Sequence, residues 1–179
     1  MPPHCDAMDG PVVRAARRAL DAGLVDLVLP YVPERAEEEV RAAFARALPV
    51  RELTDQAKEV ADRLVFETVV RLHRAGEGAP YAGLKPAGLD VGPAIPLAEA
   101  AITSGSAGEL VGFLTGVLEH ELTERLDDVR RLASLQDRSL ADARRYVGAM
   151  LGYQVYCHHL LQAIWAPAHV DPVAEAAAG

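Results

Sequence analysis

The sequence has little cysteine, no excess of basic charge and no long hydrophobic run. Its two cysteines, Cys5 and Cys157, lie at opposite ends of 179 residues. That is too few for a disulfide framework, so a reducing compartment is expected. Basic residues number 18 against 26 acidic ones, and the net charge of −8 disfavours binding to the phosphate backbone of nucleic acid. No apolar stretch has the length of a membrane span, and no secretory signal opens the chain. We therefore expect a cytoplasmic protein with neither nucleic acid nor membrane as partner.

Common catalytic and cofactor motifs are also missing. The sequence contains no GxGxxG or GxxxxGK[ST] phosphate loop, no GxSxG, no HExxH and no CxxC. It also lacks a pair of Glu-x-x-His motifs, which disfavours a ferritin-like di-iron centre. Candidate chemistry must therefore be argued from individual residues and their spacing.

The residues that are present predict an all-α protein. Half of them are apolar and a quarter are charged, which is a globular balance. The apolar residues recur at helical spacing, and no alternating run indicates a strand. We expect one helical-bundle domain over residues 1–167, built from about four longer helices and several short ones, and a frayed tail over residues 168–179.

Capping residues predict where the helices begin and end. Pro11 is typical of a first helical turn, Gly23 of a C-terminal stop, and Thr54 of an N-cap. With the apolar spacing, they predict helices over residues 10–23, 25–32, 33–44, 54–76, 97–102, 109–135 and 140–165.

Oppositely charged residues four positions apart predict ion pairs on helix faces. Glu37 is expected to pair with Arg41, and Glu67 with Arg71. We expect Glu67 to serve in such a pair rather than in chemistry.

Residues 75–96 form the one long irregular segment, with five glycines and four prolines. Such loops are usually functional or linkers. Tyr81 and Lys85 are candidate catalytic residues in it, and Lys85 with Arg74 could bind an anionic group of a small-molecule substrate. The alternative is a rigid connector between two halves of the chain.

A weak internal similarity recurs at an offset of 82 residues. Ala19, Leu20 and Gly23 correspond to Ala101, Ile102 and Gly105, and further apolar positions match in the same register. The similarity predicts two related halves, each a short helix followed by two longer ones, joined by the Gly/Pro loop. A chance likeness of Ala- and Leu-rich helices is the alternative.

The segment HCDAMDG at residues 4–10 carries the strongest chemical signal. Imidazole, thiolate and carboxylate groups are ligands of transition metals, so His4, Cys5 and Asp9 are candidate metal ligands. Nucleophilic catalysis by Cys5 with His4 is a second use, although adjacent residues seldom align for proton transfer. The plain alternative is a polar N-terminus in which Asp9 caps the first helix.

Two further histidines are candidate metal ligands. His73 shares an apolar stripe with Phe66 and Val69, so its ring should point inward; a hydrogen-bonded core histidine is the alternative. His158 lies at the edge of the apolar stripe of the last helix and could complete a site. Cys157 lies within that stripe and is expected to be an inert core thiol.

The pattern PHCDxxDGPVV, followed by residues 66–90, resembles a bacterial family of unknown function, and the likeness covers about residues 4–147. More locally, His4, Cys5, Asp6 and Gly10 resemble the N-terminal nickel hook of nickel superoxide dismutase. That resemblance implies a nickel site and redox chemistry. Pro2 and Pro3 precede the histidine, however, and Asp9 stands where the hook has its second thiolate.

The sequence therefore favours a transition-metal-binding helical bundle. Nickel is the first choice, with zinc, copper or iron as alternatives, and redox chemistry on a small molecule would suit a thiolate-bound metal. The competing hypothesis is a metal-free helical protein that binds a partner or a small molecule. A homo-oligomer is compatible with either.

Overall fold

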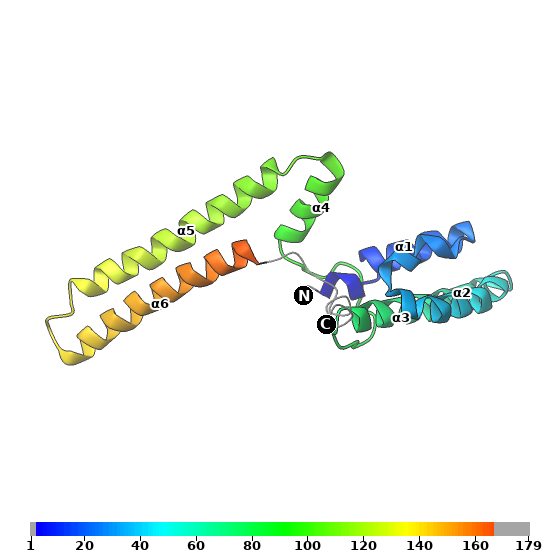
Figure 1. The fold of residues 1–179 in the computed structure, drawn as a ribbon, viewed down its shortest axis with the longest axis horizontal. Helices are drawn as coiled ribbons and strands as arrows, with labels where there is room; N and C mark the ends of the chain where they lie inside the picture. The colour runs from blue at the N-terminus through cyan, green and yellow to red at the C-terminus, as the bar shows by residue number, and fades with distance from the viewer. Residues whose placement is uncertain (1–2, 167–179) are drawn as a thin grey trace, which may run out of the picture. The chain divides into compact units, whose positions relative to one another are not determined.

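The computed structural model describes residues 3–166 and is all-α in this range, as predicted (Figure 1). An isolated bridge between Ala7 and Lys85 is its only β-type pairing. The helices are α1 (Pro11–Ala22), α2 (Glu37–Arg51), α3 (Asp55–Gly76), α4 (Ala94–Ser104), α5 (Gly108–Ala133) and α6 (Leu140–Trp165), with short 3-10 helices at Pro3–Asp6, Val25–Leu27, Leu29–Tyr31 and Glu34–Ala36.

The capping residues act as expected. Pro11 opens α1, and Gly23 ends it in the left-handed region with φ of 66°. The Thr54 hydroxyl accepts a hydrogen bond from the Ala57 amide at 3.0 Å. Three of the predicted helices differ clearly. The helix expected over residues 33–44 is α2, which begins at Glu37 and continues to Arg51. Residues 25–32 form 3-10 turns rather than a helix, since Pro30 has no amide hydrogen to donate. Helix α4 begins at Ala94, because Pro96 is tolerated in a first turn.

The chain divides into two compact units, whose described parts are residues 3–91 and 92–166. Each contains a shorter helix followed by two longer ones, as the 82-residue offset predicts. The correspondence extends to the caps, because Gly105 ends α4 in the left-handed region as Gly23 ends α1. The division lies within the predicted Gly/Pro loop. A single domain over residues 1–167 stays a prediction, and the tail at 168–179 lies outside the described residues.

The first unit has a closed hydrophobic core. Both α1 and α2 pack against α3. Side chains from all three helices and from the 3-10 segment are fully buried, among them Leu20, Val12, Val13, Val28, Val40, Val65, Val69 and Val70. This unit therefore has the rigid framework that a binding site requires.

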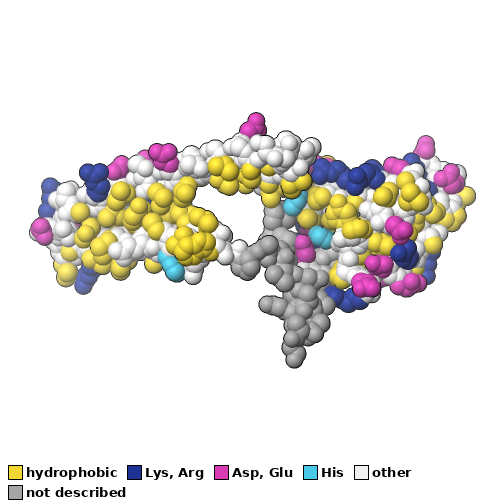
Figure 2. Space-filling view, turned by 45° about the horizontal axis from the view of Figure 1, so that its top comes forward, with side chains coloured by type: hydrophobic (Ala, Val, Ile, Leu, Met, Phe, Trp, Pro, Cys, Tyr) yellow, Lys and Arg dark blue, Asp and Glu magenta, His cyan; other side chains and the backbone are white. Residues whose placement is uncertain are grey.

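The second unit is more open. Helix α5 packs against α4 and α6, yet Leu132, which is 6% exposed, is the only buried hydrophobic residue in the described range 92–166. In Figure 2, hydrophobic side chains spread along the visible face of this unit. Among residues 3–166, no helix is both long and apolar enough to cross a membrane.

Candidate functional site

The N-terminal segment and the Gly/Pro loop bind each other through their backbones. The Lys85 amide donates to the carbonyl oxygen of Asp6 at 2.8 Å, and the Met8 amide donates to that of Lys85 at 3.0 Å. The Asp9 carboxylate accepts a hydrogen bond from the Gly88 amide at 2.8 Å. The two motifs singled out in the sequence are thus joined by hydrogen bonds. We call this contact of residues 6–9 with Lys85 and Gly88 the N-terminal junction.

Gly10 makes this junction sterically feasible. A Cβ atom at this position would lie 1.8 Å from the carbonyl oxygen of His4, so the chain can pass only where a side chain is absent. Gly10 is also the N-cap of α1, and no side chain caps that helix. The alternative that Asp9 caps the first helix is therefore wrong.

Cys5 lies in the core of the first unit. The residue is 8% exposed and packs among the apolar side chains of that core. Its Sγ atom lies 4.0 Å from both ring nitrogens of His4. Burial limits the access of solvent and substrate to the thiol. Cys157, for which a core position was expected, is only half-buried.

A row of charged groups, of which Asp6 is buried and the others are partly buried, runs beside this junction. Arg74 Nε lies 3.4 Å from Asp6 Oδ1, and Arg74 Nη1 lies 3.2 Å from Glu77 Oε2. His73 Nε2 lies 3.3 Å from Glu77 Oε1, and its Nδ1 lies 2.8 Å from the carbonyl oxygen of Tyr31. His73 thus points inward as predicted and forms polar contacts there. Two carboxylates balance the charge of Arg74, which leaves less of it for an anionic substrate.

Tyr81 packs against the core from the loop. Burial raises the pKa of its hydroxyl above the usual 10.0, and the negative charges of Glu67 and Asp6 raise this pKa further. A polar interaction with the Leu84 backbone and the positive charge of Arg63 lower the pKa and offset part of this shift. The neutral phenol is therefore favoured, which disfavours Tyr81 as a base at neutral pH. Its side chain helps to hold the loop on the core.

The other predicted positions do not gather into one site. Lys85 joins the junction through its backbone, and its side chain is half-buried. His158 is exposed on α6 in the second unit, with its ring centroid 6.1 Å from that of His159. Across residues 3–166, no cluster of three or more His, Cys, Asp or Glu side chains has a geometry that could hold a metal ion.

The ion pair predicted between Glu37 and Arg41 forms at 3.4 Å. The pair predicted between Glu67 and Arg71 is wrong. Glu67 binds Arg63 at 2.9 Å, whereas Arg71 reaches across to Glu39 of α2. The spacing along one helix could not reveal this cross-helix partner.

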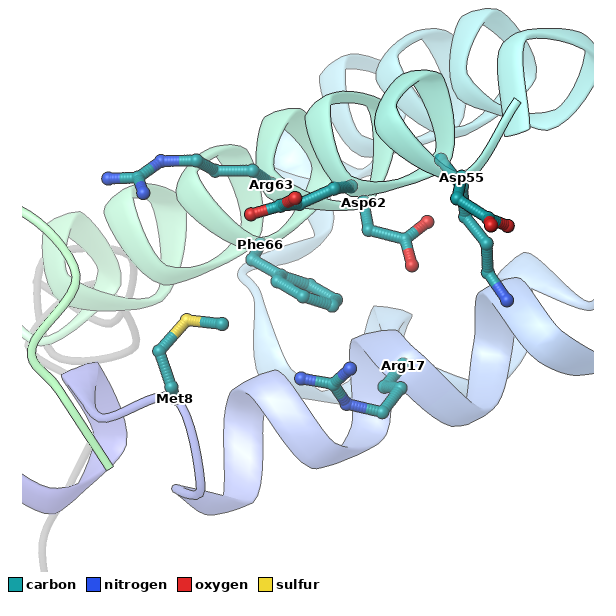
Figure 3. Close-up of a pocket in the computed structure, with 8 residues that line it drawn as sticks. Met8, Arg17, Asp55, Asp62, Arg63 and Phe66 are labelled. Carbon is teal, nitrogen blue, oxygen red and sulfur yellow. The ribbon is translucent and has the colours of Figure 1, made fainter. Parts of the chain in front are cut away.

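A pocket of about 290 Å³ lies between α1 and α3. In Figure 3, the ring of Phe66 points from α3 into the space between Met8 and Arg17. The Arg17 guanidinium lies over this ring, 5.0 Å from its centroid. The lining combines an apolar base with charges of both signs, from Met8, Arg17, Asp55, Lys58, Glu59, Asp62, Arg63 and Phe66. The sequence did not predict this site, because its charged residues have the spacing that is typical of any solvent-exposed helix face.

The pocket and the N-terminal junction are continuous through Met8. This residue donates its amide to Lys85 and turns its side chain toward the pocket (Figure 3). The segment singled out for metal chemistry thus also forms one wall of a cavity. The fold and the cavity together define an α-helical protein with a candidate binding pocket.

The chain belongs to a family of unknown function, DUF6448, whose model matches residues 9–156. The predicted membership of such a family is thereby confirmed. The matched range includes the whole Gly/Pro loop and begins after His4, Cys5 and Asp6, so the likeness to the nickel hook stays a prediction. Comparison with curated proteins and with solved structures gave no match.

Proposed function

We propose that this protein binds a small zwitterionic molecule with an apolar body in the pocket between α1 and α3. The pocket volume of about 290 Å³ is near the lower end of the range for small-molecule sites. The observation that carries the proposal is the pairing of a buried aromatic base with charged groups of both signs at one cavity.

Ion pairing distinguishes the charged groups that are available to a ligand. Asp62 is bound by Arg51, and Arg63 is bound by Glu67. Within the described residues, four other charged lining residues take part in no ion pair; they are Arg17, Lys58, Asp55 and Glu59. Two cations and two anions remain, so a ligand with one charge of each sign matches the pocket better than a singly charged one.

Three small aromatic molecules test this charge preference. Phenylalanine carries both charges, phenylacetate only the negative one and phenethylamine only the positive one. Ligand-observed NMR with the full chain should show the strongest binding for phenylalanine, because either analogue leaves one set of charged side chains without a partner. Equal binding of all three, or no binding of any, would contradict the proposal.

A matched pair of variants locates the binding. Arg17→Gln removes the cation over Phe66 and should weaken phenylalanine binding at least about fivefold. Arg46→Gln removes an exposed arginine of α2 outside the pocket and should leave binding unchanged. Equal effects of the two variants would place the binding elsewhere.

The second candidate function is binding of a transition metal by the N-terminal segment. Its support is the distance of 4.0 Å between Cys5 Sγ and either ring nitrogen of His4. A tetrahedral zinc ion would hold such donors about 3.6 Å apart, so a small movement of the imidazole would suffice. Asp9, His73 and His158 are engaged elsewhere or distant in sequence, so further donors must come from backbone amides or from outside residues 3–166.

Metal content decides this second candidate. Untagged protein should contain close to one nickel, zinc, copper or iron ion per chain by elemental analysis. Both Cys5→Ser and His4→Ala should abolish that content, and a superoxide assay then tests redox activity. Metal content that is well below one per chain and indifferent to both substitutions would rule the candidate out.

A further inference from the structure

The second unit lacks the core that its counterpart in the first unit has. At the 82-residue offset, Val147 and Leu151 of α6 correspond to Val65 and Val69 of α3. The two α3 residues are 0% exposed, whereas Val147 is 45% and Leu151 50% exposed. Equivalent apolar positions are thus covered in one unit and open in the other.

These exposed residues form a continuous stripe on α6. Val147, Leu151 and Val155 are four positions apart, so they lie on one face of the helix, and each is about half exposed. On α5, Val111, Leu114 and Val117 are exposed to a similar extent. Figure 2 shows hydrophobic side chains along the visible face of the second unit.

The composition of α6 indicates what could cover it. Residues 146–165 contain no Asp, Glu, Lys or Arg. A helix without charge over five turns is typical of a buried helix rather than a solvated one. Helices that lie on membrane surfaces usually carry Lys or Arg on the polar face, which this stretch lacks. The matching surface is therefore another uncharged, apolar helix.

The size of the surface suits a stable protein contact. Helices α5 and α6 have 26 residues each, so each is roughly 39 Å long and 10 Å wide. One face of the hairpin then covers roughly 800 Å², close to what each partner contributes to a standard protein interface.

We propose that the α5–α6 hairpins of two copies of this chain pack face to face and form a four-helix bundle. A twofold axis places the same patch on both sides of the contact, so the uncharged stripe of one copy meets its equivalent. Two antiparallel hairpins in contact reproduce the common architecture of such bundles. This self-association is independent of the pocket in the first unit.

Sedimentation velocity of the full chain between about 1 and 100 µM tests the proposal. The wild type should be a dimer at the upper concentrations. Leu151→Glu places two carboxylates in the contact and should raise the dimer dissociation constant at least about 100-fold. Val60→Glu is the control, since Val60 is an exposed apolar residue of α3, and should leave the dimer intact.

Circular dichroism separates dissociation from unfolding, and Leu151→Gln provides a milder second variant. Helix content close to that of the wild type, together with a monomeric mass, supports the proposal for either substitution. A wild type that stays monomeric at 100 µM, with or without binding to anionic lipid vesicles, overturns it. A dimer that both substitutions leave intact overturns it equally.

Discussion

The guanidinium of Arg51 donates a hydrogen bond to the carbonyl oxygen of Leu20 at 2.7 Å. Leu20 lies in the last turn of α1, and its carbonyl oxygen also accepts a hydrogen bond from the Gly23 amide at 3.3 Å. The same side chain binds Asp62 of α3 and Asp21 of α1. One arginine at the end of α2 thus connects the three helices of the first unit.

We expect Arg51→Met to lower the free energy of unfolding by about 3 kcal/mol, because Asp62 would remain buried without its cation. Urea denaturation followed by circular dichroism measures this loss. Arg46→Met, an exposed neighbour on the same helix, should cost no more than about 0.5 kcal/mol. Similar losses in both variants would show that Arg51 contributes no more than a surface residue.

Gly10→Ala should destabilise the first unit by at least about 2 kcal/mol, because the added methyl group would collide with the His4 backbone and displace the N-terminal segment. Gly116→Ala is the matched control. Its Cβ would meet open space within α5, where alanine favours the helix. Thermal denaturation should show the melting temperature falling in the first variant only. A melting temperature preserved in Gly10→Ala would contradict the close contact.

The raised pKa of Tyr81 predicts a stability that depends on pH. Since the folded-state pKa exceeds the unfolded one of about 10, the stabilising contribution is complete below pH 10 and is lost as pH rises through the folded-state pKa. Urea midpoints measured from pH 8 to 11 should therefore fall more steeply for the wild type than for Tyr81→Phe. Parallel curves for the two proteins would contradict the prediction.

Leu20 and Ile102 occupy equivalent positions in α1 and α4, but Leu20 is 2% exposed and Ile102 is 83% exposed. Leu20→Ala should cost about 3 kcal/mol through lost burial and a cavity. Ile102→Ala should cost less than about 0.5 kcal/mol. Chemical denaturation of the two variants gives the comparison, and a large loss for Ile102→Ala would mean that something covers α4 in solution.

Helix positions were predictable because the signals are local. Pro11, Gly23 and Thr54 act on their own turns, and the apolar spacing belongs to single helices. The internal offset likewise predicted the order of helices in both units. The caps and the apolar spacing depend on neighbours within a few residues, which one sequence reveals directly.

The candidate site was less predictable because it depends on distant contacts. Asp9 binds the amide of Gly88, and Arg71 binds Glu39 of another helix. No spacing rule identifies such partners. The pocket likewise combines Met8 with residues of α1 and α3, and their charged side chains resemble any solvated helix surface when read in order.

The bridge between Ala7 and Lys85 has a consequence for synthesis. The N-terminal segment leaves the ribosome first, but its backbone partners lie beyond α3 and emerge last in this unit. Asp6, Met8 and Asp9 can therefore gain these partners only when the chain has been made as far as Gly88, and the core around Cys5 can close only after α3 has been made. During that interval the thiol that is buried in the finished protein is open to oxidation.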